Sequence, residues 1–237
     1  MEDKKHAEIT SLFVLVFMGM VALYACVGLT TGLFGALWHD LLRFVTGDVT
    51  KIARRDDNDL GHMLAVAMTL CAVVFPFVVV IGHAAQRLTP RWRQGVGKEG
   101  VLVPLPQDPS VGKRLWAVAI ALHKVAAIVF YEEVYSRWIF LGLIAGSNPS
   151  ANSFYGLFLI GNTPWALVHL WNYPAGERHP IRVMPHFLLG IPMAIMFRTY
   201  GLGGAFLVHF VCDLIPLLPG LVDQAYHGKS LTLRSTG

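Results

Sequence analysis

Charged residues are scarce in this sequence. Only 14% of its 237 residues are Asp, Glu, Lys or Arg, whereas 54% are hydrophobic, and the mean hydropathy is +0.53. An ordinary soluble domain carries about 25% charged residues. The composition therefore excludes that class and indicates a polytopic membrane protein.

Cysteine is rare as well. Cys26, Cys71 and Cys212 lie in apolar stretches and show no Cys-x-x-Cys spacing, which excludes a disulfide framework and a zinc ribbon. We expect three buried, inert thiols. No Gly-rich phosphate loop occurs either, and residues 201–204, Gly-Leu-Gly-Gly, are interpreted as a tight turn between two short spans.

The chain also lacks an internal repeat, which a secondary carrier usually shows. Its formal net charge is +4 and its pI is about 9.1, but the basic residues lie in short loops beside apolar stretches. They do not form a basic face interleaved with aromatic residues, so nucleic-acid binding is not indicated.

What the sequence has in abundance is long hydrophobic stretches. With about 20 residues needed per crossing, it predicts an all-α, polytopic membrane helical bundle of about six transmembrane helices in a single domain, residues 1–237. The expected spans are 9–37, 60–86, 116–146, 153–172, 183–198 and 202–222, and residues 87–114 form a loop.

Basic residues indicate the orientation of this bundle. The N-terminal tail, the 87–114 loop, the 173–182 loop and the C-terminal tail hold twelve of the 19 Lys and Arg residues, and the opposite side holds Arg43, Lys51, Arg54, Arg55 and Arg198. The positive-inside rule places both termini and the 87–114 loop in the cytoplasm. Short loops and a short chain favour a multi-pass protein of the bacterial plasma membrane.

Two expected spans contain ionisable residues in the motifs Glu132-Glu133-x-x-x-Arg137 and His209-x-x-x-Asp213. A charged side chain at bilayer depth costs at least about 2.5–3.5 kcal/mol, so such residues face a bundle interior or a wet cavity and are usually functional. The two motifs therefore indicate a polar site inside the bundle.

The helical spacing of these residues indicates the role of each. Glu133 and Arg137 are four residues apart, on one helix face, and are expected to form an ion pair. Adjacent residues diverge by about 100°, so Glu132 is expected to point elsewhere without a partner, as a general base. Asp213 is expected either to orient the imidazole of His209 or to join it in binding a metal.

A third span supplies Trp165-x-x-x-His169. One carboxylate and two imidazoles from three spans provide the components for activating water and hydrolysing an acyl bond. Asn172 lies on roughly the same face as His169 and could support it, and His186 is a further candidate for a supporting role.

The order Glu-Glu-x-x-x-Arg, aromatic-x-x-x-His and His-x-x-x-Asp/Asn on successive apolar helices resembles the CAAX-protease and bacteriocin-processing (CPBP) family, also called Abi. This family of intramembrane peptidases includes the type II CaaX prenyl endopeptidase, the Ras-converting enzyme. The resemblance covers residues 113–222 and implies hydrolysis of a peptide bond within the membrane.

The resemblance also implies roles for these residues. Glu132 and His169 would activate water, and His209 with the residue at Asp213 would stabilise the oxyanion, while Glu133 and Arg137 would be a structural or positioning pair. Asp213 stands where prenyl endopeptidases carry Asn. An ionised carboxylate cannot donate a hydrogen bond to an oxyanion, so Asp213 must be protonated, orient His209 or bind a metal.

We expect no cofactor, with zinc held by His169, His209 and Asp213 as the alternative, because a catalytic zinc needs three protein ligands. The expected partners are membrane lipid and a peptide or membrane-protein substrate, of which prenylated CaaX peptides are one class. The alternative functions are a non-catalytic CPBP-like scaffold or immunity protein and, less favoured, a proton-coupled carrier.

Overall fold

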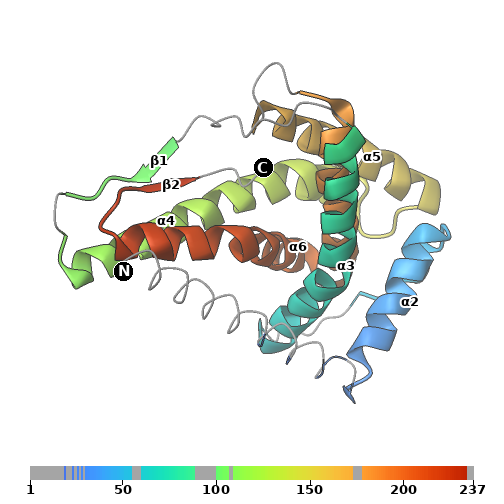
Figure 1. Cartoon of the computed structure of the whole chain (residues 1–237). Coiled ribbons are helices and arrows are strands. Elements are labelled where there is room, and N and C mark those ends of the chain that lie inside the picture. The colour runs from blue at the N-terminus through green and yellow to red at the C-terminus, as the bar shows by residue number, and fades with distance from the viewer. Residues whose placement is uncertain are drawn as a thin grey trace.

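The protein is mostly helical in the computed structural model (Figure 1). The structure describes residues 30–54, 60–88, 100–106, 109–172 and 178–233, together with Gly19, Leu23, Cys26 and Gly28 as single residues. The helices are α2 (Leu33–Val45), η1 (Val49–Lys51), α3 (Leu60–Leu88), α4 (Val111–Glu133), the π-helix η2 (Val134–Ile144), α5 (Ala151–Val168), η3 (His169–Asn172), η5 (Pro180–Val183) and α6 (Met184–Tyr226).

These helices follow most of the expected spans. In the described part of the chain, Val111–Ile144 and Pro180–Ile215 are each long and apolar enough to cross a membrane, and Leu60–Cys71 is a shorter apolar stretch. The number of crossings and the cytoplasmic position of the termini stay predictions. Most of the first expected span, 9–37, lies outside the described residues.

The expected end of the first span at residue 37 is wrong. Gly32 has a positive φ of 71°, and α2 begins at the next residue, Leu33. Glycine adopts this left-handed conformation at little cost, and it interrupts the helical backbone immediately before α2.

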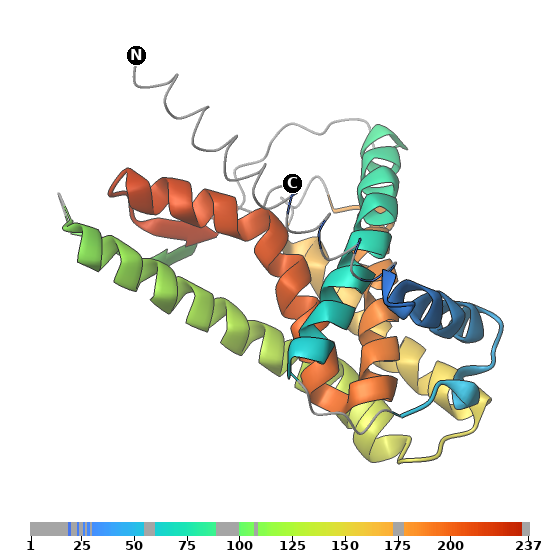
Figure 2. The ribbon, with the colours of Figure 1, turned by 90° about the horizontal axis from the view of Figure 1, so that it is seen from below.

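The turn predicted at Gly201 is confirmed. This residue has φ 72° and ψ −158° inside α6, and Figure 2 shows the helix bending sharply between two arms. The arms, 184–200 and 202–226, correspond to the fifth and sixth expected spans, 183–198 and 202–222. Pro185 lies in the first turn of α6, where the missing N–H leaves no hydrogen bond unmade.

The all-α prediction misses one feature, a pair of short antiparallel strands. They are β1 (Gly100–Val103), within the expected 87–114 loop, and β2 (Leu231–Leu233), after α6. Val103 and Leu231 are buried against α4 and the end of α6. Apolar β-branched residues in a proline-rich loop gain this burial by pairing, which a search for long helical stretches does not detect.

Helix α3 packs along α6, as both ribbon views show (Figures 1 and 2). Val66 and Leu70 of α3 share one buried cluster with Val208 and Val211 of α6 and with Trp165 of α5. This cluster fixes the second arm of α6, which carries His209, against the centre of the bundle.

Two cysteines lie within this contact. Cys71 and Cys212 are free and buried, as expected, with their sulphur atoms 2.8 Å apart, whereas Cys26 is exposed, contrary to expectation. A small displacement brings the two buried sulphurs to the bonding distance of about 2.05 Å. We expect a membrane-permeable thiol oxidant to join them in a disulfide, with release of two protons and transfer of two electrons to the oxidant.

The measurement is mass spectrometry of proteolytic peptides from oxidised membranes. A peptide pair linking Cys71 to Cys212, and lost on reduction, is the expected result. Cys26 serves as the internal control for exposure to oxidant. Linkage of Cys26 to either buried cysteine would contradict the packing of α3 on α6.

Candidate active site

The two adjacent glutamates lie where an α-helix becomes a π-helix. Helix α4 ends at Glu133 and continues directly as η2. Short π-helical segments change the direction of side chains and occur frequently at functional sites. This segment also packs tightly on α5: a Cβ atom on Gly161 would lie 2.3 Å from the carbonyl oxygen of Ser136, so only glycine fits there.

The predicted ion pair is present. Arg137 Nη1 lies 2.8 Å from Glu133 Oε1, and both side chains are almost completely buried. The guanidinium also donates to Ser136 Oγ and to Asn162 Oδ1, and it lies 4.3 Å above the ring of Trp165. Arg137 therefore joins η2 to α5 through charge, hydrogen bonds and a cation–π contact.

Asn162 extends this network to α6. Its amide nitrogen donates to the carbonyl oxygen of Phe187 at 3.0 Å. A Cβ atom on Gly190 would lie 1.9 Å from Asn162 Oδ1, so the glycine makes room for the amide. Sequence reasoning did not select Asn162. Its one signal is a polar side chain in an apolar helix.

Buried His209 lies between carboxylates from two helices. Its Nδ1 is 2.7 Å from Glu133 Oε1, whereas its Nε2 is 3.6 Å from Glu132 Oε2 and 3.7 Å from Asp213 Oδ2. Only the first distance is a hydrogen bond. Because a carboxylate accepts, Nδ1 carries the proton in this bond.

Of the roles expected for Asp213, orienting the imidazole of His209 is not the one that this geometry favours. The i,i+4 spacing does place Asp213 and His209 on one face, but the ring is turned so that Nδ1 faces α4. Glu133 therefore holds the ring. Asp213 approaches the opposite nitrogen from a more exposed side, with 42% of its side chain exposed.

Glu132 has a partner that the sequence did not reveal. Its Oε2 accepts a hydrogen bond from Trp165 Nε1 at 2.7 Å, and about a third of its side chain is exposed. The expectation of a partnerless carboxylate pointing away from Glu133 is wrong, since both glutamates reach the same imidazole of His209. Trp165 is a neutral donor, however, so it leaves the negative charge of Glu132 in place.

His169 is half-buried at the junction of α5 and η3. Its Nδ1 lies 2.9 Å from the carbonyl oxygen of Trp165. A carbonyl oxygen only accepts, so Nδ1 carries the hydrogen, and Nε2 of the neutral ring carries a lone pair. The indole of Trp165 lies 5.0 Å from the His169 ring and 5.3 Å from the His209 ring, centroid to centroid.

His186, from the first arm of α6, joins this group. Its ring centroid is 4.1 Å from that of His169, and its buried Nδ1 has no hydrogen-bond partner among the residues that the structure describes. The expected supporting position next to His169 is thus occupied by His186. The side chain of Asn172 lies outside the described residues.

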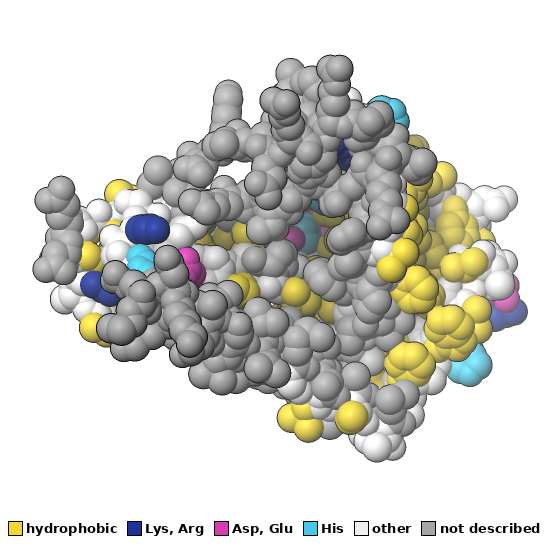
Figure 3. Space-filling view, in the orientation of Figure 1, with side chains coloured by type: hydrophobic (Ala, Val, Ile, Leu, Met, Phe, Trp, Pro, Cys, Tyr) yellow, Lys and Arg dark blue, Asp and Glu magenta, His cyan; other side chains and the backbone are white. Residues whose placement is uncertain are grey.

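Side chains from α4, α5 and α6 thus come together as one polar cluster in an apolar bundle. In Figure 3, acidic and histidine side chains are visible near the middle of the face shown, among hydrophobic and undescribed side chains. Such a cluster has a carboxylate, an imidazole with a free lone pair on Nε2 (His169) and a second imidazole (His209) that donates from Nε2 once this nitrogen is protonated. These are the groups that hydrolysis of an amide requires.

The geometry of His169, His209 and Asp213 does not suit a bound zinc ion. Within the described ranges, no three His, Cys, Asp or Glu side chains gather as metal ligands. Glu133 occupies Nδ1 of His209, and Nε2 of the same ring faces Glu132 and Asp213. Binding zinc through His169, His209 and Asp213 would require these side chains to move. The absence of a cofactor stays a prediction.

Comparison with known proteins confirms the resemblance seen in the motifs. Residues 114–215 match the family described as type II CAAX prenyl endopeptidase Rce1-like. The matched region contains every residue of the cluster, from Glu132 to Asp213. No curated protein and no solved structure matches the chain. The family match and the apolar helices support a membrane-embedded protease.

Proposed function

We propose that the protein is an intramembrane endopeptidase in which Glu132 activates the water that hydrolyses the substrate. The observation that carries this proposal is the approach of Glu132 and His209 to 3.6 Å, from helices far apart in the sequence. It lies in the part of the chain that matches a prenyl endopeptidase family.

In the proposed reaction, Glu132 takes a proton from water while the water oxygen bonds to the carbonyl carbon of the scissile peptide. The hydrogen bond from Trp165 Nε1 keeps the carboxylate of Glu132 in place. The lone pair on His169 Nε2 is a second acceptor for the proton that leaves the water. The carbon–nitrogen bond then breaks as the proton passes to the amine nitrogen. General-base catalysis of this kind contributes about 10²–10⁴-fold.

The oxyanion is stabilised by His209. Glu133 accepts the hydrogen on Nδ1 of His209. When Nε2 of His209 is protonated as well, the imidazolium donates its Nε2 hydrogen to the oxyanion. Asp213 is close to the same nitrogen, and only its protonated form can donate. His186 acts indirectly, by holding the ring of His169 in place.

The surroundings of Glu132 support an apolar substrate. Phe130 and Tyr131 precede it on α4 and are exposed. Phe130 lies 6.2 Å from Phe206 of α6, which stacks on Phe210 at 5.7 Å, centroid to centroid. Exposed aromatic side chains that precede Glu132 on the same helix suit a substrate with an apolar anchor, and we propose prenylated peptides with a CaaX end as the first to test.

The test uses the full chain in liposomes with a farnesylated CaaX peptide, the same peptide without the lipid, and mass spectrometry of the products. We expect one internal peptide bond to be cut, faster in the farnesylated peptide, with activity kept after treatment with a metal chelator. Loss of cleavage on chelation, restored by zinc, would favour the metal alternative. No cleavage of either peptide or of other membrane peptides would favour a scaffold.

A further inference from the structure

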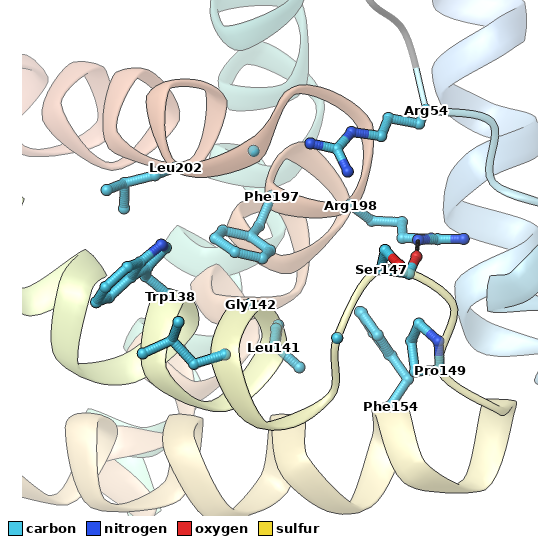
Figure 4. A pocket seen from close by; sticks show the side chains of 13 residues that line it. Arg54, Trp138, Leu141, Gly142, Ser147, Pro149, Phe154, Phe197, Arg198 and Leu202 are labelled. Carbon is cyan, nitrogen blue, oxygen red and sulfur yellow. Dashed lines mark hydrogen bonds between the residues drawn. The ribbon is translucent and has the colours of Figure 1, made fainter.

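A cavity of about 310 Å³ lies away from the catalytic cluster, at the far end of η2. Its walls come from η2, the loop 145–150, the end of the first arm of α6 and residue Arg54 (Figure 4). From Glu133 to Gly142, which lines the cavity, the chain advances nine residues, about 13 Å along a helix. The cavity is therefore a separate site.

Two arginines line this cavity. Arg198 donates to the carbonyl oxygen of Ser147 at 3.0 Å, and Arg54 lines the same cavity. Figure 4 shows the Arg54 side chain extending toward the cavity from the opposite side to the loop. No acidic residue is among the described residues that line the cavity. Two like charges that have no acidic partner among the described lining residues favour an anion in the cavity.

Most of the other side chains that line the cavity are apolar. Trp138, Leu141 and Phe197 line the cavity beside the arginines (Figure 4). A small inorganic anion would leave these apolar side chains uncovered. A ligand with a charged head and an apolar body would use both parts, because guanidinium groups bind phosphate in a forked geometry and apolar side chains bury acyl carbon.

The position in the chain agrees with a lipid ligand. The cavity lies where Val111–Ile144, one of the two long apolar stretches, ends. Tryptophan and arginine side chains gather at this depth, between lipid tails and water. The sequence places Arg54 and Arg198 on the non-cytoplasmic side.

We propose that this cavity binds the phosphate headgroup of an anionic phospholipid, with Arg54 and Arg198 on the phosphate and Trp138 on the upper acyl chain. The headgroup of phosphatidylglycerol fits, whereas the choline cation of phosphatidylcholine is repelled by the two arginines. The site is independent of the catalytic cluster, so it stands whether or not the chain cleaves peptides.

The experiment measures lipid adducts on the purified full chain by native mass spectrometry. The probes are phosphatidylglycerol, phosphatidylcholine and inorganic phosphate. We expect phosphatidylglycerol to bind at least ~5-fold more tightly than phosphatidylcholine, and Arg54→Gln to weaken it by ~10-fold, the usual effect of losing one charge-assisted hydrogen bond. Inorganic phosphate at the same concentration should not displace it.

Matched variants distinguish lipid binding in this cavity from a general attraction of anionic lipid to positive charge. Lys51→Gln removes one positive charge from an exposed residue outside the cavity and should leave lipid binding unchanged. Arg198→Lys keeps the charge but not the fork, and should weaken binding less than Arg198→Gln. Arg54 is exposed and its variant should fold normally.

Three results would overturn the proposal. One is equal binding of the two lipids, and another is displacement by inorganic phosphate, which would show a free-phosphate site. The third is unchanged binding in Arg54→Gln. Asp56, Asp57 and Asp59 follow Arg54 in the sequence and lie outside the described residues. If they neutralised Arg54, that third result would appear.

Discussion

Replacing Glu132 by Gln is expected to lower the rate of peptide cleavage by about 10²–10⁴-fold, the contribution usual for a general base. The amide oxygen of Gln still accepts the hydrogen bond from Trp165 Nε1, so the local structure should persist. What is lost is the negative charge, and with it the ability to take a proton from water. The measurement is single-turnover cleavage in liposomes with equal amounts of inserted protein.

Asp223 offers a matched control for Glu132→Gln. It lies four residues before His227 on α6, with an Oδ1 to Nε2 distance of 3.7 Å, and it is exposed. Asp223→Asn removes a carboxylate of similar setting outside the cluster and should leave cleavage unchanged. Cleavage by Glu132→Gln at the rate of the unmodified protein would remove Glu132 from the mechanism and assign the activation of water to another group of the cluster.

Local spacing was enough to predict one part of the site. Glu133 and Arg137 had to share a helix face because they are four residues apart, and the structure has the pair. The same argument placed His209 and Asp213 on one face. Because charged residues in apolar spans face the bundle interior, the two helix faces were expected to meet. The spacing does not give the distance between the helices.

Ring orientation and long-range partners could not be predicted. Which nitrogen of His209 meets which carboxylate depends on how α4 and α6 pack, and on the change from α- to π-helix after Glu133. Glu132 and Glu133 are adjacent in α4, and the 100° between them still lets both approach His209, because they meet opposite nitrogens of its ring. The hydrogen bond from Trp165 likewise joins residues 33 positions apart.

The fold shows the same division. Gly201 was recognised as a turn because four residues, three of them glycine, interrupt two apolar stretches. The strands at Gly100–Val103 and Leu231–Leu233 were missed, because each is too short to show an alternating pattern. They pair across more than a hundred residues of chain.

Replacing Arg137 by Met is expected to lower the free energy of unfolding by about 3–5 kcal/mol, the usual cost of removing one partner of a buried ion pair. Glu133 would remain completely buried and negatively charged, with only His209 to balance it. Thermal unfolding in detergent, with retention of the folded state followed by size-exclusion chromatography, measures the loss.

Lys51→Met is the matched control for Arg137→Met. Lys51 pairs with Asp48 at 3.0 Å on the surface, with 66% and 50% of the two side chains exposed. Such exposed pairs contribute about 0–1 kcal/mol, so this variant should unfold close to the unmodified protein. Equal losses in the two variants would show that the pair of Glu133 and Arg137 is not buried as the structure has it.

A double variant separates stability from positioning. Glu133 Oε2 and Arg137 Nε are buried without hydrogen-bond partners in the described part of the chain, so the pair is not optimised for stability. Glu133→Leu with Arg137→Met replaces it by apolar side chains of similar size, an exchange that is often neutral or stabilising. We therefore expect unfolding to return close to that of the unmodified protein.

Cleavage should not return in this double variant, because no carboxylate then holds Nδ1 of His209 and Nε2 no longer faces Glu132 in a fixed direction. A stable protein with a low rate would show that the buried pair serves to orient the imidazole. A stable protein that cleaves normally would show that the pair is structural, and would leave Asp213 as the residue that orients His209.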